Sequence, residues 1–181
     1  MFSIIELIRA IIVTAAIGYI FSGSIKYNLT GDSKKDKLEG IKFSIFVAAP
    51  AVILHELAHK LVAISYGLNA EFFASYLGLG IGVLLKLISS PILIIVPGYV
   101  SISGASITQS SIIAFAGPLT NLLLWLIATL LLASKKRFSR KQLIILGYTK
   151  KINIILFFFN MIPFGPFDGA KVFNGLFSLL S

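Results

Sequence analysis

The sequence predicts an all-α protein that crosses a membrane several times, with about four transmembrane helices in a single membrane-embedded domain over residues 1–181. Of the 181 residues, 57% are hydrophobic and only 13% are charged, which is too few to cover a soluble surface. The Lys and Arg residues gather in short connections between long apolar segments. The net charge of +9 therefore indicates contact with a lipid bilayer rather than with nucleic acid.

Two apolar segments near the N-terminus are long enough to span a bilayer. Residues 4–21 are apolar apart from Glu6, Arg9 and two small polar residues. A polar connection over residues 22–40 follows. Residues 41–66 then form a second span, roughly 39 Å long at ~1.5 Å per residue of helix.

Glycine and proline residues interrupt the apolar pattern over residues 67–104. Gly78 and Gly80 break its first half, and Pro91 and Pro97 break its second half. This pattern predicts short β-strands or a re-entrant hairpin, which a membrane tolerates only where the backbone is buried in protein or faces water.

Two further spans are predicted in the C-terminal half. Residues 111–133 contain no charged residue. A basic connection separates them from residues 152–180, which form the last span. Prolines and a glycine break this last helix between Pro163 and Asp168, so it crosses as two half-helices.

The two histidines of the chain, His55 and His59, stand four residues apart in the second span. On a helix this spacing places both imidazoles on one face, where they can bind one metal ion, with Glu56 beside them as a candidate general base. The chain has no cysteine, so the ligands of a zinc ion must be His, Asp or Glu.

Catalytic zinc commonly takes three protein ligands and leaves one position for water, so the histidine pair needs a third partner. Six of the seven acidic residues are unsuitable: they lie in a polar loop, in the first span, beyond the glycine that ends the second helix, or on another face of that helix. The seven are Glu6, Asp32, Asp36, Glu39, Glu56, Glu71 and Asp168. Asp168 stands in a helix broken inside the membrane, and we predict that it completes the zinc site.

Three motifs in apolar spans occur in a characteristic order. They are His55–His59, then Gly117–Asn121, then Asn160–Pro163 followed by Asp168–Gly169. From about Ile41 to Val172 the chain resembles the site-2 proteases, a family of membrane-embedded zinc metalloproteases.

The resemblance implies a role for each motif residue. His55, His59 and Asp168 would bind a single catalytic zinc ion. Glu56 would take a proton from the reacting water and pass it to the leaving amine. Asn160 would hydrogen-bond the substrate backbone or the developing oxyanion.

The resemblance also implies a transmembrane protein as substrate and the cell membrane as location. A helical substrate must unwind before cleavage, and the strand-like residues 71–77 or 92–102 are candidates to pair with it. Ala58 and Ala170 replace glycines that are usual in the family, and no PDZ or CBS domain is expected within this length. The basic loops before Ile41 and after Ala133 favour a cytoplasmic position, whereas the resemblance implies the opposite orientation.

Several alternatives stay open at this point. A metal transporter could use the same ligands without needing Glu56, and an inactive relative could serve as a membrane interaction protein. Asp168 could cap the half-helix that follows it. For Gly117–Asn121 the sequence favours a helix contact bridged by an amide.

Overall fold

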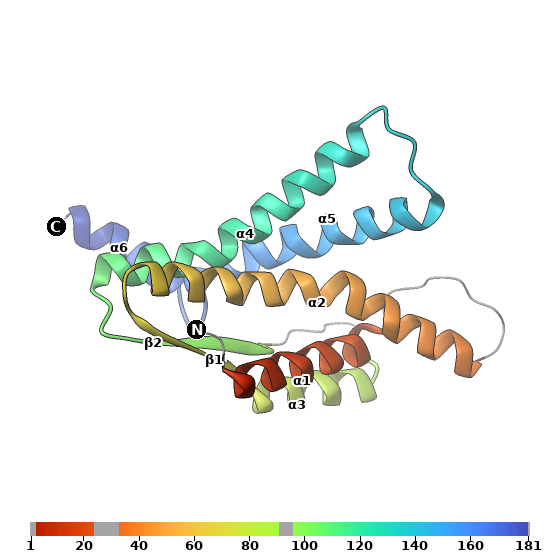
Figure 1. Cartoon of the computed structure of the whole chain (residues 1–181), viewed down its shortest axis with the longest axis horizontal. Coiled ribbons are helices and arrows are strands. Elements are labelled where there is room, and N and C mark those ends of the chain that lie inside the picture. The colour runs from red at the N-terminus through yellow and green to blue at the C-terminus, as the bar shows by residue number, and fades with distance from the viewer. Residues whose placement is uncertain (1–2, 24–32, 91–95, 181) are drawn as a thin grey trace. The chain divides into compact units, whose positions relative to one another are not determined.

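A computed structural model describes residues 3–23, 33–90 and 96–180 and contains six helices and two strands over these residues (Figure 1). The elements in chain order are α1 (Ile4–Phe21), α2 (Ser33–Ser65), β1 (Asn69–Ala74), α3 (Tyr76–Leu87), β2 (Gly98–Ser103), α4 (Ile107–Ala133), α5 (Arg140–Asn160) and α6 (Asp168–Leu180). The two strands pair in a two-stranded sheet. The predicted break at Pro91 and the middle of the predicted polar connection lie outside the described residues.

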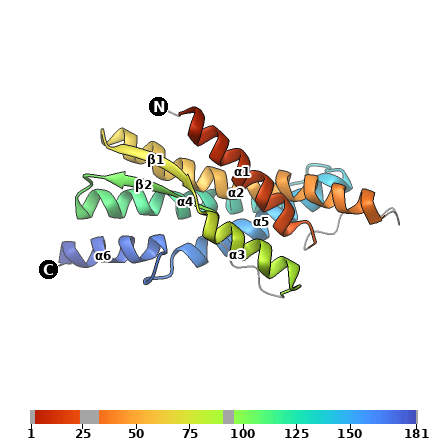
Figure 2. The ribbon, with the colours of Figure 1, turned by 90° about the horizontal axis from the view of Figure 1, so that it is seen from below.

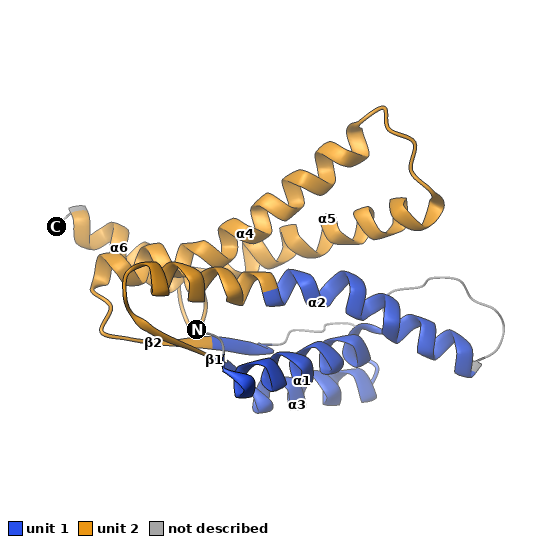
Figure 3. Cartoon of the chain, in the orientation of Figure 1, with its two compact units in different colours: residues 1–53, 72–99 blue, residues 54–71, 100–181 orange. Residues whose placement is uncertain are grey.

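Four of the described helices are long and apolar enough to cross a membrane, namely α1, α2, α4 and α5. The prediction of an all-α polytopic protein with a short β segment between the second and third strong spans is therefore confirmed. The chain is divided into two compact units (Figure 3). One comprises residues 1–53 and 72–99, and the other comprises residues 54–71 and 100–181.

In the first unit, helix α1 holds the strand β1 through two charged side chains. Glu6 Oε1 accepts a hydrogen bond of 2.8 Å from the Phe72 backbone N–H, and Arg9 Nη1 donates one of 2.9 Å to the Phe72 carbonyl. The Arg9 guanidinium also lies 4.1 Å from the centroid of the Phe73 ring. Glu6 and Arg9, the charged residues of the first span, thus form hydrogen bonds with backbone groups for which lipid offers no partner.

Helix α3 packs beside α1 in the same unit, as both views show (Figures 1 and 2). The sequence predicted strands or a hairpin for residues 67–104, and β1 and β2 agree with this, but the intervening helix was not expected. The Ser75 hydroxyl caps α3 by accepting from the Gly78 N–H at 3.2 Å. A glycine is required at position 78 because the backbone there lies close to the Val96 carbonyl, with which an added Cβ would collide. Gly78 and Gly80, predicted to break the chain, thus lie inside α3, and at Gly78 the glycine allows tight packing.

In the second unit, α2 ends in a left-handed glycine turn. Gly67 has φ +74°, and its N–H donates to the Ile64 carbonyl at 2.8 Å. The Leu68 N–H reaches back to the Ala63 carbonyl at 3.1 Å, which completes a Schellman cap. The end of the helix that carries the histidines is thereby fixed.

Helix α4 packs against both α5 and α6 in this unit (Figures 1 and 2). Capping boxes start α4 at Ser106 with Gln109 and α5 at Ser139 with Gln142. Helices α5 and α6 are separated by residues 161–167, where Gly165 takes φ +72°. The helix break therefore falls where the prolines predicted it, but it follows a helix, α5, that is by itself long enough to cross a membrane.

Candidate metal centre

The two histidines lie on one face of α2 and are buried, with 5% and 6% of their surfaces exposed. Their Nε2 atoms are 3.0 Å apart, and their ring planes stand nearly perpendicular at 84°. This is the arrangement that a four-residue spacing on a helix predicts, with both rings able to approach one ion.

Asp168 is the first residue of α6, directly after the break in the last crossing. Its Oδ2 atom lies 3.1 Å from His55 Nε2 and 3.2 Å from His59 Nε2. The turn before it is tight, because a Cβ added at Gly169 would come within 2.5 Å of the Ile162 carbonyl oxygen. The structure thus brings the carboxylate chosen by elimination to the histidine pair.

The hydrogen bond that each imidazole makes through Nδ1 bears on whether its Nε2 atom can bind a metal ion. The Nδ1 atom of His59 lies 2.7 Å from the Ile113 carbonyl oxygen, which can only accept. His55 Nδ1 lies 2.6 Å from the side-chain oxygen of Asn121. A neutral ring that donates through Nδ1 to these oxygens has a lone pair on Nε2, the nitrogen that faces Asp168, with which to bind a metal ion.

The Nε2 atoms of His55 and His59 and the Oδ2 atom of Asp168 form a triangle with sides of 3.0, 3.1 and 3.2 Å. A tetrahedral zinc ion with bonds of about 2.0–2.1 Å separates its ligands by roughly 3.3 Å. Among the described residues, these three form the group able to hold a metal ion. Their donor atoms, spacing and outer hydrogen bonds fit zinc.

Gly117 of α4 provides the space in which the two rings meet. A Cβ added at this position would lie 2.6 Å from His55 Nε2 and closer still to His59 Nε2. Both values are well below van der Waals contact, and the atoms concerned are the ones that face the carboxylate. The glycine of the Gly117–Asn121 motif is therefore part of the site, beyond the helix contact that the sequence favoured.

We expect Gly117→Ala to displace the imidazole rings, so that zinc bound per purified protein falls well below that of the natural chain. Gly147→Ala is the matched control, since Gly147 is an exposed glycine of α5 with open space around its Cα. That control should retain its zinc, because alanine favours a helix interior by about 1 kcal/mol over glycine. Full zinc content in Gly117→Ala, measured by elemental analysis, would contradict this account of the site.

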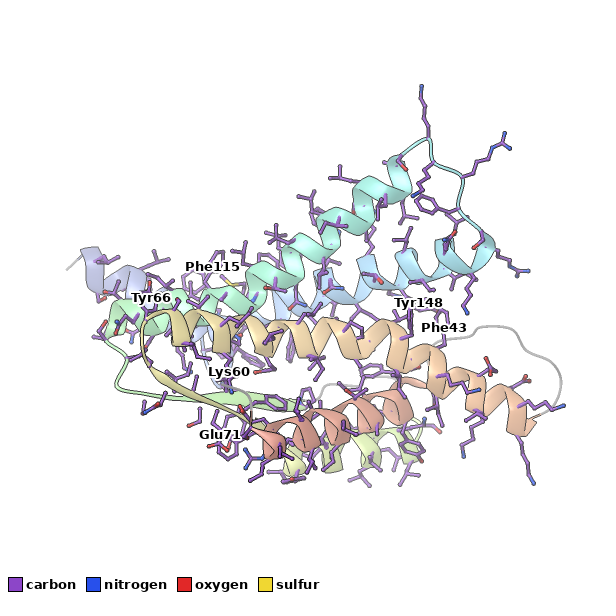
Figure 4. The ribbon with its side chains drawn as sticks, in the orientation of Figure 1. Phe43, Lys60, Tyr66, Glu71, Phe115 and Tyr148 are labelled. Atoms are coloured by element: carbon purple, nitrogen blue, oxygen red, sulfur yellow. The ribbon has the colours of Figure 1, made fainter. Side chains whose placement is uncertain are left out.

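The remaining predicted site residues lie on the same unit. Glu56, half-buried on α2, interacts electrostatically with both histidines and with Asp168. Asn160 is the last residue of α5, and its Nδ2 donates to the Leu156 carbonyl at 3.0 Å. Lys60, which was not a predicted site residue, follows His59 on α2 and is labelled in Figure 4. It is 1% exposed.

Sequence reasoning did not single out Asn153, and it gave Asn121 a structural role only. Both amides are buried, and Asn121 contacts His55 from α4. Polar side chains inside apolar spans are costly in lipid and often functional, so their position alone was a signal. Their partners lie far away in sequence, so only the fold identifies what they contact.

Four helices able to cross a membrane, one of which carries a buried His-x-x-x-His pair that faces a carboxylate, define a membrane protein with a candidate metal site. Residues 43–144, more than half of the chain, match peptidase family M50. The chain therefore belongs to this family, that of the site-2 proteases, as its motifs predicted.

Two curated relatives support this assignment. A protein of Methanocaldococcus jannaschii, provisionally named a zinc metalloprotease, is 41% identical over 132 residues, covering 71% of this chain and 68% of that protein. A protein of Synechocystis with the same provisional name is 29% identical over 126 residues, covering 70% of this chain and 29% of that protein. No solved structure gives a significant match.

Proposed function

We propose that this protein is an intramembrane zinc endopeptidase that hydrolyses peptide bonds within or near transmembrane segments of other membrane proteins. The observation that carries this proposal is the meeting of His55, His59 and Asp168 beside Glu56, on helices that can span a bilayer. Regulated proteolysis in the cell membrane would be the corresponding biological role.

The ligand set would consist of two neutral imidazoles and one carboxylate. A zinc ion held by them would make a water molecule more acidic and would polarise the scissile carbonyl. The Ile113 carbonyl and the Asn121 side chain hold the imidazoles in the tautomer that presents Nε2.

Glu56 is the proposed general base and acid. It follows His55 directly on α2, so its carboxylate emerges from the same helix turn as the ligands without being one of them. It would accept a proton from the attacking water and deliver that proton to the amine of the leaving peptide. A metal transporter with the same three ligands would have no need of this group.

Asn160 is the proposed substrate-positioning group. An amide nitrogen carries two donor hydrogens, and the Leu156 carbonyl accepts one of them. The second hydrogen is available to a substrate carbonyl, where a fixed donor stabilises developing negative charge.

An unwound substrate is proposed to pair as an added strand with β2 rather than β1. At Phe72 of β1, the backbone N–H and carbonyl already bind Glu6 and Arg9 of α1. A substrate strand at that point of β1 would have to displace two charged side chains. Of the two strand-like segments that could pair with a substrate, the proposed one is therefore the segment that contains β2, Gly98–Ser103.

Metal removal tests the proposed function directly. We expect the protein, purified in detergent and incubated with a panel of single-span membrane proteins, to cleave one or more of them. A chelator should abolish this cleavage, and added zinc should restore it. Zinc at about 100 times its dissociation constant should also stabilise the folded protein by about 2.7 kcal/mol, seen as a raised melting temperature. Cleavage that survives complete removal of the metal would refute the proposal, and zinc binding without cleavage of any substrate would favour the transporter.

A further inference from the structure

Two adjacent lysines, Lys150 and Lys151, stand in the middle of α5. This helix has 21 residues, so it is about 32 Å long and matches the hydrocarbon core of a bilayer, which is about 30 Å thick. The helix begins at Arg140 and ends at Asn160. At about 1.5 Å per residue, each lysine stands roughly 14–15 Å from the nearer end of the helix, too far for its ammonium group to reach a membrane surface by snorkelling.

Neither lysine has a polar partner in the part of the chain that the structure describes. No hydrogen bond, ion pair or cation–π contact joins the ammonium group of Lys150 or Lys151 to a described residue. The charges of the first span differ in this respect, because Glu6 and Arg9 bind backbone groups of β1. Charged side chains inside a membrane are costly, and those that occur are usually paired and functional.

Helix α5 is also the least covered of the four helices able to cross a membrane. In its most apolar stretch of 18 residues, 6% of the residues are buried, against 28–39% in the corresponding stretches of α1, α2 and α4. The contact with α4 lies on the face of Asn153, whose Oδ1 accepts a hydrogen bond of 2.8 Å from Asn121 Nδ2. The two lysines stand on another face, which lipid or a further protein must cover.

The lysines share one face of α5 with three other residues, here called the lysine face. Its members follow the i, i+3, i+4, i+7, i+11 spacing of a helix face and are Gly147, Lys150, Lys151, Ile154 and Phe158. Phe158 is 66% exposed, Gly147 and Lys151 are exposed, and the other two are half-buried. A Cβ added at Gly147 would meet nothing within 4 Å beyond its own stretch of helix, so a second helix can approach closely there.

We propose that the lysine face binds a transmembrane helix of another protein, one that carries an Asp or Glu near its middle. Such a carboxylate would lie at the depth of the two ammonium groups and would accept charge-assisted hydrogen bonds from them. Lipid phosphate groups lie at the two surfaces of the bilayer, so lipid supplies no anion at this depth. The apolar side chains of Ile154 and Phe158 would pack against the same partner helix.

A second copy of this chain does not offer such a carboxylate. Three of its seven acidic residues lie within predicted spans, namely Glu6, Glu56 and Asp168. Glu6 binds the Phe72 N–H, and the other two belong to the candidate metal centre. The remaining four lie in the predicted polar connection over residues 22–40 or on β1. The acidic helix must therefore come from a different protein.

Designed single-span helices test this inference without the natural partner. Two probes consist of leucine and alanine and carry either Asp or Asn at the central position. The purified full chain carries a fluorescent donor and the probe an acceptor, and energy transfer is measured in phosphatidylcholine vesicles at a low ratio of probe to lipid. We expect the Asp helix to bind about 5–30-fold more tightly than the Asn helix, the range that polar contacts between membrane helices give.

Lys150→Leu combined with Lys151→Leu should bind the Asp helix no more tightly than the Asn helix. Leucine favours helix, and the change removes two charges without described partners, so the helix content and the melting temperature should not fall. Lys135→Leu with Lys136→Leu is the matched control. It changes another adjacent pair of exposed lysines, in the connection after α4, and should keep the preference for the Asp helix.

Three results would overturn this inference. The first is equal binding of the Asp and Asn helices by the natural chain, and the second is a preference for Asp that survives the loss of Lys150 and Lys151. The third is self-association of the natural chain that disappears with these two lysines, because a second copy would then occupy the lysine face. The assay involves neither zinc nor cleavage, so its outcome does not depend on the proposed function.

Discussion

Glu56→Gln is expected to bind zinc as the natural chain does and to lose about 10²–10⁴-fold in the rate of peptide cleavage, the usual contribution of a general base. Glutamine keeps the size and polarity of the side chain but cannot take up a proton. The three ligand atoms come from other residues, so their spacing of 3.0–3.2 Å does not depend on this carboxylate.

Two measurements on one preparation check this result: zinc content by elemental analysis and initial cleavage rate of a single-span substrate. Glu39→Gln makes the same change at an exposed position of α2, where Glu39 pairs with Lys42 at 3.1 Å. Exposed pairs of this kind contribute about 0–1 kcal/mol, so this control should cleave normally. A Glu56→Gln enzyme that cleaves at the natural rate would exclude Glu56 as the base.

Asp168→Ala is expected to weaken zinc binding by more than about 100-fold, since changes to outer-shell partners alone cost about 10–100-fold. The carboxylate oxygen lies within 3.2 Å of both imidazole nitrogens and supplies the one negative charge among the three ligands. Its loss leaves two neutral donors, which do not offset the positive charge of the ion.

Asp168 also lies in the first turn of α6, so its removal can weaken the helix start by about 0.5–2 kcal/mol. Asp168→Asn separates the two effects, because asparagine caps a helix nearly as well but carries no charge. We expect Asp168→Asn to keep the natural melting temperature of the metal-free protein and still to lose zinc in a chelator competition assay. Zinc retained by both variants would point to another ligand, with Glu71 the first to examine.

The membrane-spanning helices could be predicted because hydropathy and length are local properties of the sequence. Their ends could not be predicted in the same way. Helix α2 begins at Ser33, before the predicted start at residue 41, and α5 begins at Arg140, before residue 152. Many of the added residues are Lys, Arg, Glu and Gln, which favour helix without being apolar. Hydropathy marks the part of a helix that lipid can cover, and the helix itself continues beyond it.

The proposed metal ligands of the candidate site could be predicted because short sequence motifs contain them. The histidine spacing and the short supply of acidic residues were enough to select His55, His59 and Asp168. The hydrogen-bonded support from Asn121 and Asn153 was not predictable, because it joins positions 32 and 66 residues apart through helix packing. The space at Gly117 was hidden for the same reason.

The bare backbone at Gly117 has a consequence for reading other genomes. A homologue with alanine or any larger residue at the equivalent position would retain the histidine signature yet lack room for both rings to converge. The residue at the position equivalent to Gly117, considered together with the His-Glu-x-x-His motif, would therefore distinguish active peptidases from inactive homologues better than the motif alone.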